Sequence, residues 1–270
     1  MQAVALKIAG WLGLMLVCLL AVAWVQRPDG RLHVYALDTP GDAILVQAPS
    51  GRFTLIDGGS EPTLLATLLG RRLPFWRRDL ATVVLTRADS AHLPGQVAAL
   101  ARYRPDMALG PTELARGGTA DEWRRLAQSA AVPLRTLRAG QRLGLGGGAN
   151  LRVLGVAPGE EGGAVLLIEY GATRVLVHTG GPLGDSAATA AAGAPLAALI
   201  YPWQRELDTP LLAALRPQVL IFSSAYEAAA PALLSYAERR QFSPKLYHEK
   251  NDGTVELISD GRRFWCQTQR

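Results

Sequence analysis

The sequence predicts an α/β protein built as a four-layer αββα sandwich, preceded by one N-terminal transmembrane helix. Two clusters of short apolar runs, separated by turn residues, are each followed by alternating strand and helix patterns. Such halves bury their apolar faces when two sheets pack face to face with helices outside. The composition is 49% hydrophobic and 19% charged, which is typical of folded proteins and excludes a disordered chain.

The transmembrane helix is predicted from the stretch at residues 8–25, which carries no charge. Its length suits a helix that crosses a bilayer. A cleavable signal peptide is the alternative, because Ala21-Val22-Ala23 has the small-x-small pattern of a cleavage site. We predict a tail at 1–7, a retained anchor at 8–25, a linker at 26–31 and one domain at 32–270. The expected location is the cell membrane, with a single pass and an extracytoplasmic domain.

Net charge and cysteine content do not indicate a function by themselves. The net charge of +5 comes mainly from arginine, a bias that base composition of the genome can produce. We therefore do not take the charge alone as a sign of nucleic-acid binding. Cys18 and Cys266 lie near opposite ends of the chain and do not form a disulfide framework.

The predicted elements follow from apolar runs bounded by turn residues. Strands are expected at 32–37, 43–48, 52–56, 81–85, 151–156, 164–170, 173–178, 196–201, 218–223, 254–258 and 263–266. Helices are expected at 62–69, 96–103, 121–131 and 230–240.

The loop at residues 86–95 is the first candidate for a functional site. It follows a predicted buried strand, and it places Asp89 and His92 three residues apart. Loops at strand ends often carry the chemistry of α/β proteins. One carboxylate and one imidazole are too few to hold zinc, which needs three or four protein ligands.

The segment at 71–78 is the second candidate. It interleaves arginines with aromatic residues, namely Arg71, Arg72, Phe75, Trp76, Arg77 and Arg78. Such a segment can contact single-stranded DNA, with the aromatic rings stacked on bases, or an anionic lipid surface. The alternative is a solvated loop whose aromatic side chains anchor it to the domain.

Several motifs in order resemble the metallo-β-lactamase fold, and more narrowly the extracytoplasmic C-terminal domain of ComEC-type DNA-uptake proteins. Leu32-His33-Val34 leads into the segment 37–43, Leu-Asp-Thr-Pro-Gly-Asp-Ala, which is similar to the family's Leu-Asp-Val-Gly-Gln-Gly-Asp-Ala. Residues 55–59, Leu-Ile-Asp-Gly-Gly, match the next signature, and Leu85-Thr86 begins the metal motif. The motif Gly253-Thr254-Val255 with Asp260-Gly261 is similar to the closing hairpin.

The metal ligands that the resemblance implies are mostly replaced. Arg87 stands where the family has its first histidine, Ala91 where it has an aspartate, and Gly181 where an aspartate bridges the metals. The later His-His-Gly motif falls on Trp203-Gln204-Arg205. A guanidinium ~4 Å from a dication would cost roughly 8 kcal/mol at an effective dielectric of about 20. The resemblance therefore predicts this scaffold without its dinuclear metal centre.

Some residues remain that could form a makeshift single-metal site. Asp89 and His92 could hold a single zinc or manganese with Asp57, or with Asp38 and Asp42. His178 is a possible replacement ligand or a buried strand residue, and the second interpretation is favoured, as it is for His33 and His248.

The function predicted first is a membrane-anchored, catalytically inactive module for binding or assembly, linked to DNA uptake by the resemblance. It would need no metal and would have the membrane, other membrane-protein subunits, single-stranded DNA or anionic lipid as partners. One alternative is a residual metal-dependent hydrolase of nuclease or phosphodiesterase type. The other is an accessory structural subunit of a membrane complex.

Overall fold

The structure is a computed structural model that describes residues 11–19, 27–112, 114, 117–157, 162–180, 193, 195–202, 209–223 and 240–270. Residues 11–19 form a helix with exposed side chains. No helix within the described ranges is long and apolar enough to cross a membrane, and the rest of the predicted anchor lies outside those ranges.

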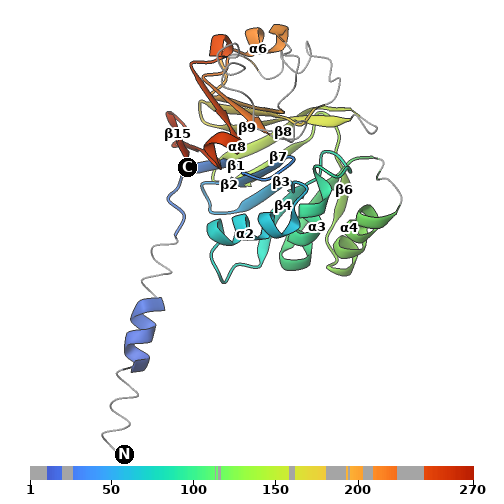
Figure 1. Cartoon of the computed structure of the whole chain (residues 1–270). Coiled ribbons are helices and arrows are strands. Elements are labelled where there is room, and N and C mark those ends of the chain that lie inside the picture. The colour runs from blue at the N-terminus through green and yellow to red at the C-terminus, as the bar shows by residue number, and fades with distance from the viewer. Residues whose placement is uncertain are drawn as a thin grey trace, which may run out of the picture.

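The domain consists of two β-sheets packed face to face, with helices on the outer face of each (Figure 1). The first sheet has the order β15–β14–β1–β2–β3–β4–β5–β6. Its strands are β1 (Leu32–Ala36), β2 (Ala43–Gln47), β3 (Phe53–Asp57), β4 (Asp79–Val84), β5 (Arg104–Gly110), β6 (Leu134–Thr136), β14 (Val255–Ser259) and β15 (Phe264–Thr268). The pairs from β15 to β3 are antiparallel, and those from β3 to β6 are parallel.

The second sheet has the order β13–β12–β11–β10–β9–β8–β7. Its strands are β7 (Arg142–Gly146), β8 (Ala149–Ala157), β9 (Gly163–Tyr170), β10 (Thr173–His178), β11 (Ala198–Pro202), β12 (Val219–Ser223) and β13 (Lys245–His248). Here β7 to β10 form an antiparallel meander and β10 to β13 are parallel.

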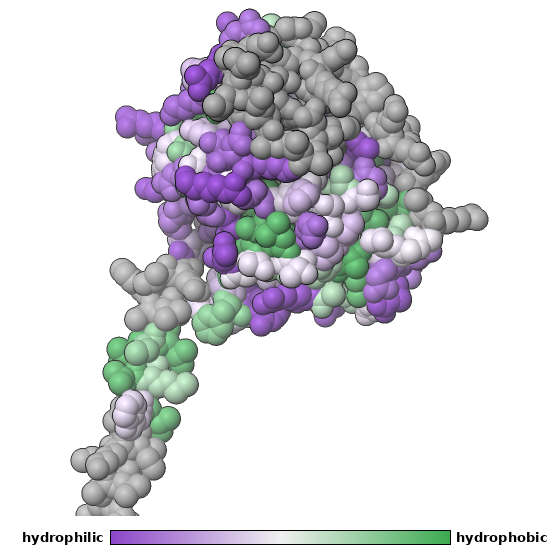
Figure 2. Space-filling model, in the orientation of Figure 1, coloured by the Kyte–Doolittle hydropathy of each residue, from purple (hydrophilic) through white to green (hydrophobic). Residues whose placement is uncertain are grey.

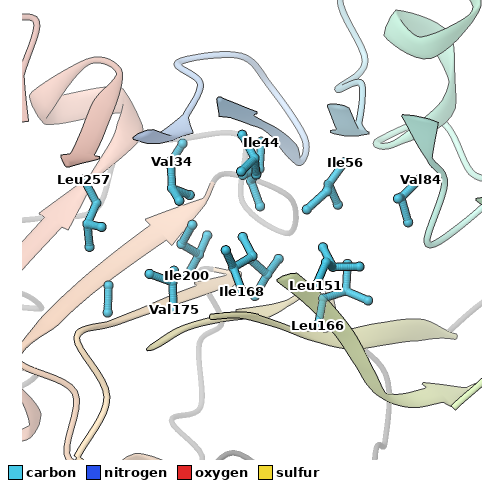
Figure 3. Close-up of a cluster of buried hydrophobic side chains, with 14 of the residues drawn as sticks. Val34, Ile44, Ile56, Val84, Leu151, Leu166, Ile168, Val175, Ile200 and Leu257 are labelled. Atoms are coloured by element: carbon cyan, nitrogen blue, oxygen red, sulfur yellow. The ribbon is translucent and has the colours of Figure 1, made fainter. Parts of the chain in front are cut away.

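The main core lies between the two sheets. Successive side chains of a strand point to opposite faces of its sheet, so every second residue of a strand enters this core. Figure 3 shows Val34, Ile44, Ile56, Val84 and Leu257 of the first sheet facing side chains of the second. The neighbouring residues Leu45, Leu55 and Val83 point the other way, into the core beneath the helices. Both faces of each central strand are therefore buried, which is why these strands are almost continuously apolar.

The outer layers are helical. Three helices cover the first sheet: α2 (Pro62–Arg72), α3 (Leu93–Arg102) and α4 (Gly118–Ser129). On the second sheet, α6 (Thr209–Leu215) packs Leu212 and Leu215 against strand residues such as Leu199 and Leu220, which form a further core on this side. The short elements η1 (Arg240–Phe242) and α8 (Glu249–Asp252) flank β13. This arrangement confirms the predicted α/β sandwich.

Several predicted boundaries differ from the structure for local reasons. The helix α2, predicted at 62–69, continues past Gly70 and ends at Arg72, because Leu73 adopts an extended conformation. The strand β5 was not predicted, because the polar start Arg104-Pro105-Asp106 obscures the apolar end of this strand. The helix predicted at 230–240 lies outside the described residues apart from Arg240.

Candidate functional site

Three loops meet at one edge of the first sheet, and they come after β1, β3 and β4. Backbone hydrogen bonds tie them together. The Asp42 N–H donates to the Ala91 carbonyl at 3.2 Å, and the Gly58 N–H donates to the His92 carbonyl at 2.8 Å. The Gly59 N–H donates to the Asp42 carbonyl, also at 2.8 Å. The backbones of these loops are therefore held against one another, and their side chains start from fixed positions.

Glycines allow this close approach of backbones. A Cβ on Gly95 would lie 1.8 Å from the Gly58 oxygen, and one on Gly58 would lie 2.1 Å from the Gln96 nitrogen. A Cβ on Gly41 would lie 1.9 Å from the Ala91 oxygen. Only glycine fits at these crossings, which explains the glycines in the segments 37–43 and 55–59.

His92 lies at the centre of the site and is almost completely buried, with 1% of its surface exposed. Its Nδ1 lies 2.5 Å from Asp89 Oδ1, and its Nε2 lies 3.0 Å from Asp42 Oδ2. Burial alone would lower the pKa of His92, but the hydrogen bonds to Asp42 and Asp89 and the nearby charge of Asp57 raise the pKa to about 10. The ring is an imidazolium at neutral pH, and both nitrogens donate.

Arg87 completes this chain of charges from the outer side. Its Nη2 lies 2.7 Å from Asp89 Oδ2, and only 12% of its side chain is exposed. Burial raises the pKa of Asp89, but His92 and Arg87 lower it by more, so that this carboxyl stays ionised. The order of groups is Arg87, Asp89, His92, Asp42, with cations and carboxylates alternating.

Asp57, which the sequence offered as one alternative ligand of a makeshift metal site, is bound to Thr86. Both of its oxygens accept hydrogen bonds from Thr86: Oδ1 from the backbone N–H at 2.7 Å, and Oδ2 from the hydroxyl at 2.6 Å. Asp57 is fully buried, and burial raises its pKa to about 7, even though His92 and the Thr86 bonds act in the opposite direction. Asp57 thus fixes the start of the 86–95 loop.

A chain of hydroxyl groups continues from Asp57 into the second sheet. The Thr179 hydroxyl donates to Thr86 Oγ1 at 2.8 Å, and Thr179 Oγ1 accepts from the Ala164 N–H at 3.1 Å. Thr86 follows β4 of the first sheet, whereas Ala164 lies in β9 of the second sheet and Thr179 directly follows β10. The site is therefore a polar link across the interface of the two sheets.

The structure brings together only some of the predicted ligands. Asp42, Asp89 and His92 are in direct contact, but Asp38 binds Arg270 Nη2 at 2.8 Å. His178 ends β10, where its Nδ1 accepts the Gly180 N–H at 3.1 Å, and it is a buried strand residue as predicted. Gly181 and Trp203-Gln204-Arg205 lie outside the described residues.

The described residues do not fit the metal centre that the fold implies. His92 would have to lose a proton that two carboxylates hold, and Asp57 directs both oxygens to Thr86. Within the described ranges, no group of three or more His, Cys, Asp or Glu side chains is arranged to hold a metal ion. The sequence placed Asp42 beside His92 only as an alternative metal ligand, whereas in the structure Asp42 is a direct hydrogen-bond partner of the His92 ring.

The arginine segment divides into inward and outward side chains. Arg72 donates to the Leu68 carbonyl at 3.0 Å and lies over the Tyr35 ring, and Arg77 donates to the Gly51 carbonyl at 2.5 Å. Arg71, Arg78 and Trp76 are exposed. Arg72 and Arg77 thus turn toward the domain, whereas Arg78 is exposed and donates to the carbonyls of Phe75 and Arg77.

Neither a protein-family model nor a curated protein sequence matches the chain. Among solved structures, YhfI from Bacillus subtilis, a metallo-β-lactamase fold protein, matches with a TM-score of 0.59 at 12% identity, over 87% of this chain and 100% of that chain. A diphosphatase from the PhnP family matches with a TM-score of 0.54 at 14% identity, over 84% and 98% of the two chains. CmlA, a diiron β-hydroxylase from Streptomyces venezuelae, matches with a TM-score of 0.53 at 13% identity, over 80% of this chain and 52% of that chain.

The TM-scores show a common fold, and at such low identity they show no shared activity or substrate. The narrower resemblance to ComEC-type proteins stays a prediction. With two sheets packed between helical layers, and a polar site where the loops after β1, β3 and β4 meet, the chain has the metallo-β-lactamase fold.

Proposed function

We propose that this protein is a membrane-anchored, catalytically inactive member of the metallo-β-lactamase fold that acts as a binding or assembly module. The observation that carries the proposal is the alternation of Arg87, Asp89, His92 and Asp42 at the meeting point of the loops. Two side-chain cations neutralise carboxylates there, as metal ions do in a hydrolase of this fold.

The electrostatic argument supports this proposal. A metal ion and the Arg87 guanidinium would compete for Asp89, and their mutual repulsion would be roughly 8 kcal/mol at ~4 Å and an effective dielectric of about 20. A hydrolytic metal also needs enough ligands to lower the pKa of its bound water to about 7. The charge pairs already present neutralise the carboxylates without a metal. The link to DNA uptake remains part of the proposal and depends on the sequence motifs alone.

The first test is the metal content of the full chain, purified in mild detergent without chelators and measured by elemental analysis. We expect substoichiometric zinc, manganese and iron. One or more tightly held metal ions per chain, lost in a His92→Asn variant, would overturn the proposal. The matched control is an Arg87→His, Ala91→Asp, Asp42→Asn variant. It restores two family ligands and frees His92 Nε2, so its metal affinity should rise.

The second test separates the module from a residual hydrolase. Hydrolysis of bis(p-nitrophenyl) phosphate with added Mn²⁺ or Zn²⁺ should not exceed the rate without protein. A rate that an Asp89→Asn substitution abolishes would support the hydrolase instead. Co-purification with other membrane proteins, followed by cross-linking, would distinguish an assembly subunit from a module that binds a ligand.

A further inference from the structure

We propose that the turn at residues 74–77 is a docking tip that seats Phe75 and Trp76 in the headgroup layer of an anionic membrane. The proposal rests on the proposed membrane anchoring and adds the surface that the domain presents to the lipid. We call these four residues the aromatic tip.

The aromatic tip is a tight turn with two aromatic residues in its central positions. The Arg77 N–H donates to the Pro74 carbonyl at 2.8 Å, so Phe75 and Trp76 are the two residues inside the turn. Their rings lie edge to face, with centroids 4.8 Å apart and an interplanar angle of 82°. They are 63% and 47% exposed. The sequence left open whether they anchor the loop, and the structure directs them to the outside.

Arginines fix the turn in this position from behind. Arg77 donates to the Gly51 carbonyl and lies over the Phe53 ring, with its Cζ 5.4 Å from the centroid. Arg78 Nη1 donates to the Phe75 and Arg77 carbonyls at 2.8 and 2.9 Å. These contacts hold the turn in the conformation that exposes the two rings. Binding therefore costs little further conformational entropy in the turn.

The exposure of these rings is unusual for the domain. Among the described residues outside the 11–19 helix, the next most exposed large hydrophobic side chains are Leu134 at 42% and Leu64 at 37%. Figure 2 shows the 11–19 helix as mainly hydrophobic, whereas the visible face of the domain is mostly hydrophilic or mixed, with small hydrophobic areas. Trp favours the membrane–water interface because its ring is apolar and its N–H is polar.

The position of the aromatic tip connects it with the N-terminal segment. The Pro28 ring packs on Gly51, where a Cβ would lie 2.2 Å from Pro28 Cγ. Gly51 also accepts the hydrogen bond from Arg77 that holds the tip. The chain therefore leaves the domain toward the predicted anchor beside the tip, and an anchor in the bilayer would hold the tip at its surface.

Charge and ring geometry favour lipid over single-stranded DNA. Arg71, in the last turn of α2, and Arg78, which binds the Phe75 carbonyl, are exposed and flank the tip in the chain. Exposed arginines next to a bilayer attract anionic headgroups. Stacking on bases needs open ring faces. The edge-to-face contact between Phe75 and Trp76 covers part of one face, whereas insertion among headgroups needs only their exposed outline.

The experiment uses the full chain in liposomes of phosphatidylcholine with or without phosphatidylglycerol. One nitroxide spin label is attached at a time: at Cys18 in a Cys266→Ala background, and at Trp76→Cys or Leu134→Cys in a Cys18→Ser, Cys266→Ala background. Collision with oxygen, which concentrates in lipid, is compared with collision with a water-soluble nickel chelate. Thermal unfolding followed by circular dichroism checks that each variant is folded.

We expect the label at position 76 to be shielded from nickel and accessible to oxygen, more so with phosphatidylglycerol, while the label at 134 stays aqueous. Arg71→Gln, which removes a charge but none of the hydrogen bonds that hold the tip, should reduce the extra shielding that the anionic lipid gives. If the Cys18 label lies in the bilayer but position 76 is as aqueous as position 134, the docking tip is wrong and the anchor stands. If the Cys18 label is also aqueous, the proposed anchoring fails. Immobilisation of the label at 76 by a single-stranded oligonucleotide, without shielding by liposomes, would overturn the lipid proposal in favour of DNA.

Discussion

At the scale of single residues, the polar site shows what a motif predicts and what it does not. Asp57, Asp89 and His92 were identified from the sequence, and all three lie in or beside one cluster. Their partners were not predictable, because the direction of a carboxylate depends on how loops from distant parts of the chain pack. Asp57 and Thr86 are 29 residues apart, and Asp42 and His92 are 50 apart.

Asp57 gives a prediction on the pH dependence of stability. Burial raises its pKa to about 7, above the ordinary value of 3.8 for an aspartate. As the pH rises, Asp57 therefore loses its proton in the unfolded chain before it does so in the folded protein. Between pH 3.8 and about 7 this difference lowers the free energy of unfolding. Asn resembles the protonated carboxyl and tolerates the positive φ of 53° at this position.

We therefore expect Asp57→Asn to gain stability relative to the wild type as the pH rises, by about 1.4 kcal/mol for each unit of pKa difference at most. Urea unfolding at several pH values across this window measures the difference. A Glu61→Gln substitution, at an exposed carboxylate just before α2, serves as a control for charge removal. A constant difference between Asp57→Asn and the wild type at all pH values would contradict the prediction.

At the scale of elements, strands and helices with strong apolar patterns were predictable and elements defined by packing were not. The three strands of the first meander agree with the sequence within a residue or two, because turn residues bound them on both sides. The helix α3 begins at Leu93, whereas Gln96 was predicted, because Pro94 fits the first turn of a helix. The parallel strand β6 has three residues, which is too short for a periodic signal.

Two glycines in helices give a matched pair of predictions. A Cβ on Gly95 in α3 would lie 1.8 Å from the Gly58 backbone oxygen, whereas a Cβ on Gly70 in α2 has nothing within 4 Å. Gly95→Ala should cost about 1–3 kcal/mol of stability, as overpacking does. Gly70→Ala should add about 0.5–1 kcal/mol, because alanine is the better helix former.

Chemical denaturation of the two variants measures both effects in the same fold. Equal changes of the same sign would show that local helix propensity decides at both positions. The packing of the loop at 57–59 against α3 would then not explain why glycine stands at position 95.

At the scale of the whole molecule, the four-layer architecture was predictable because two similar halves each bury a sheet. The membrane topology was less predictable than the fold, since an apolar stretch is compatible with both a retained anchor and a cleaved signal peptide. Lys7 on one side and Arg27 with Arg31 on the other give almost no charge asymmetry to orient it. No motif in the sequence identifies a partner as specifically as the motifs at 37–43 and 55–59 identify the fold.

We predict that residues 8–25 stay attached in the mature protein. Membrane fractions should contain a chain that begins before Ile8 by N-terminal sequencing, and alkaline carbonate should not extract this chain. A Leu16→Arg substitution, which places a charge in the centre of the stretch, should weaken retention. A mature N-terminus at Trp24 would contradict the prediction and favour secretion.

The hydroxyl chain from Asp57 through Thr86 to Thr179 has a consequence for how such a protein can evolve. Every member is buried, so replacing one of them strands its neighbour without a partner, at a cost of about 1–3 kcal/mol. If hydrolysis was lost as we propose, new residues at the rim, at positions such as 87 and 91, would have been tolerated long before the interior could change. Selection for stability alone would preserve the outline of an enzyme's centre for generations after its chemistry had gone.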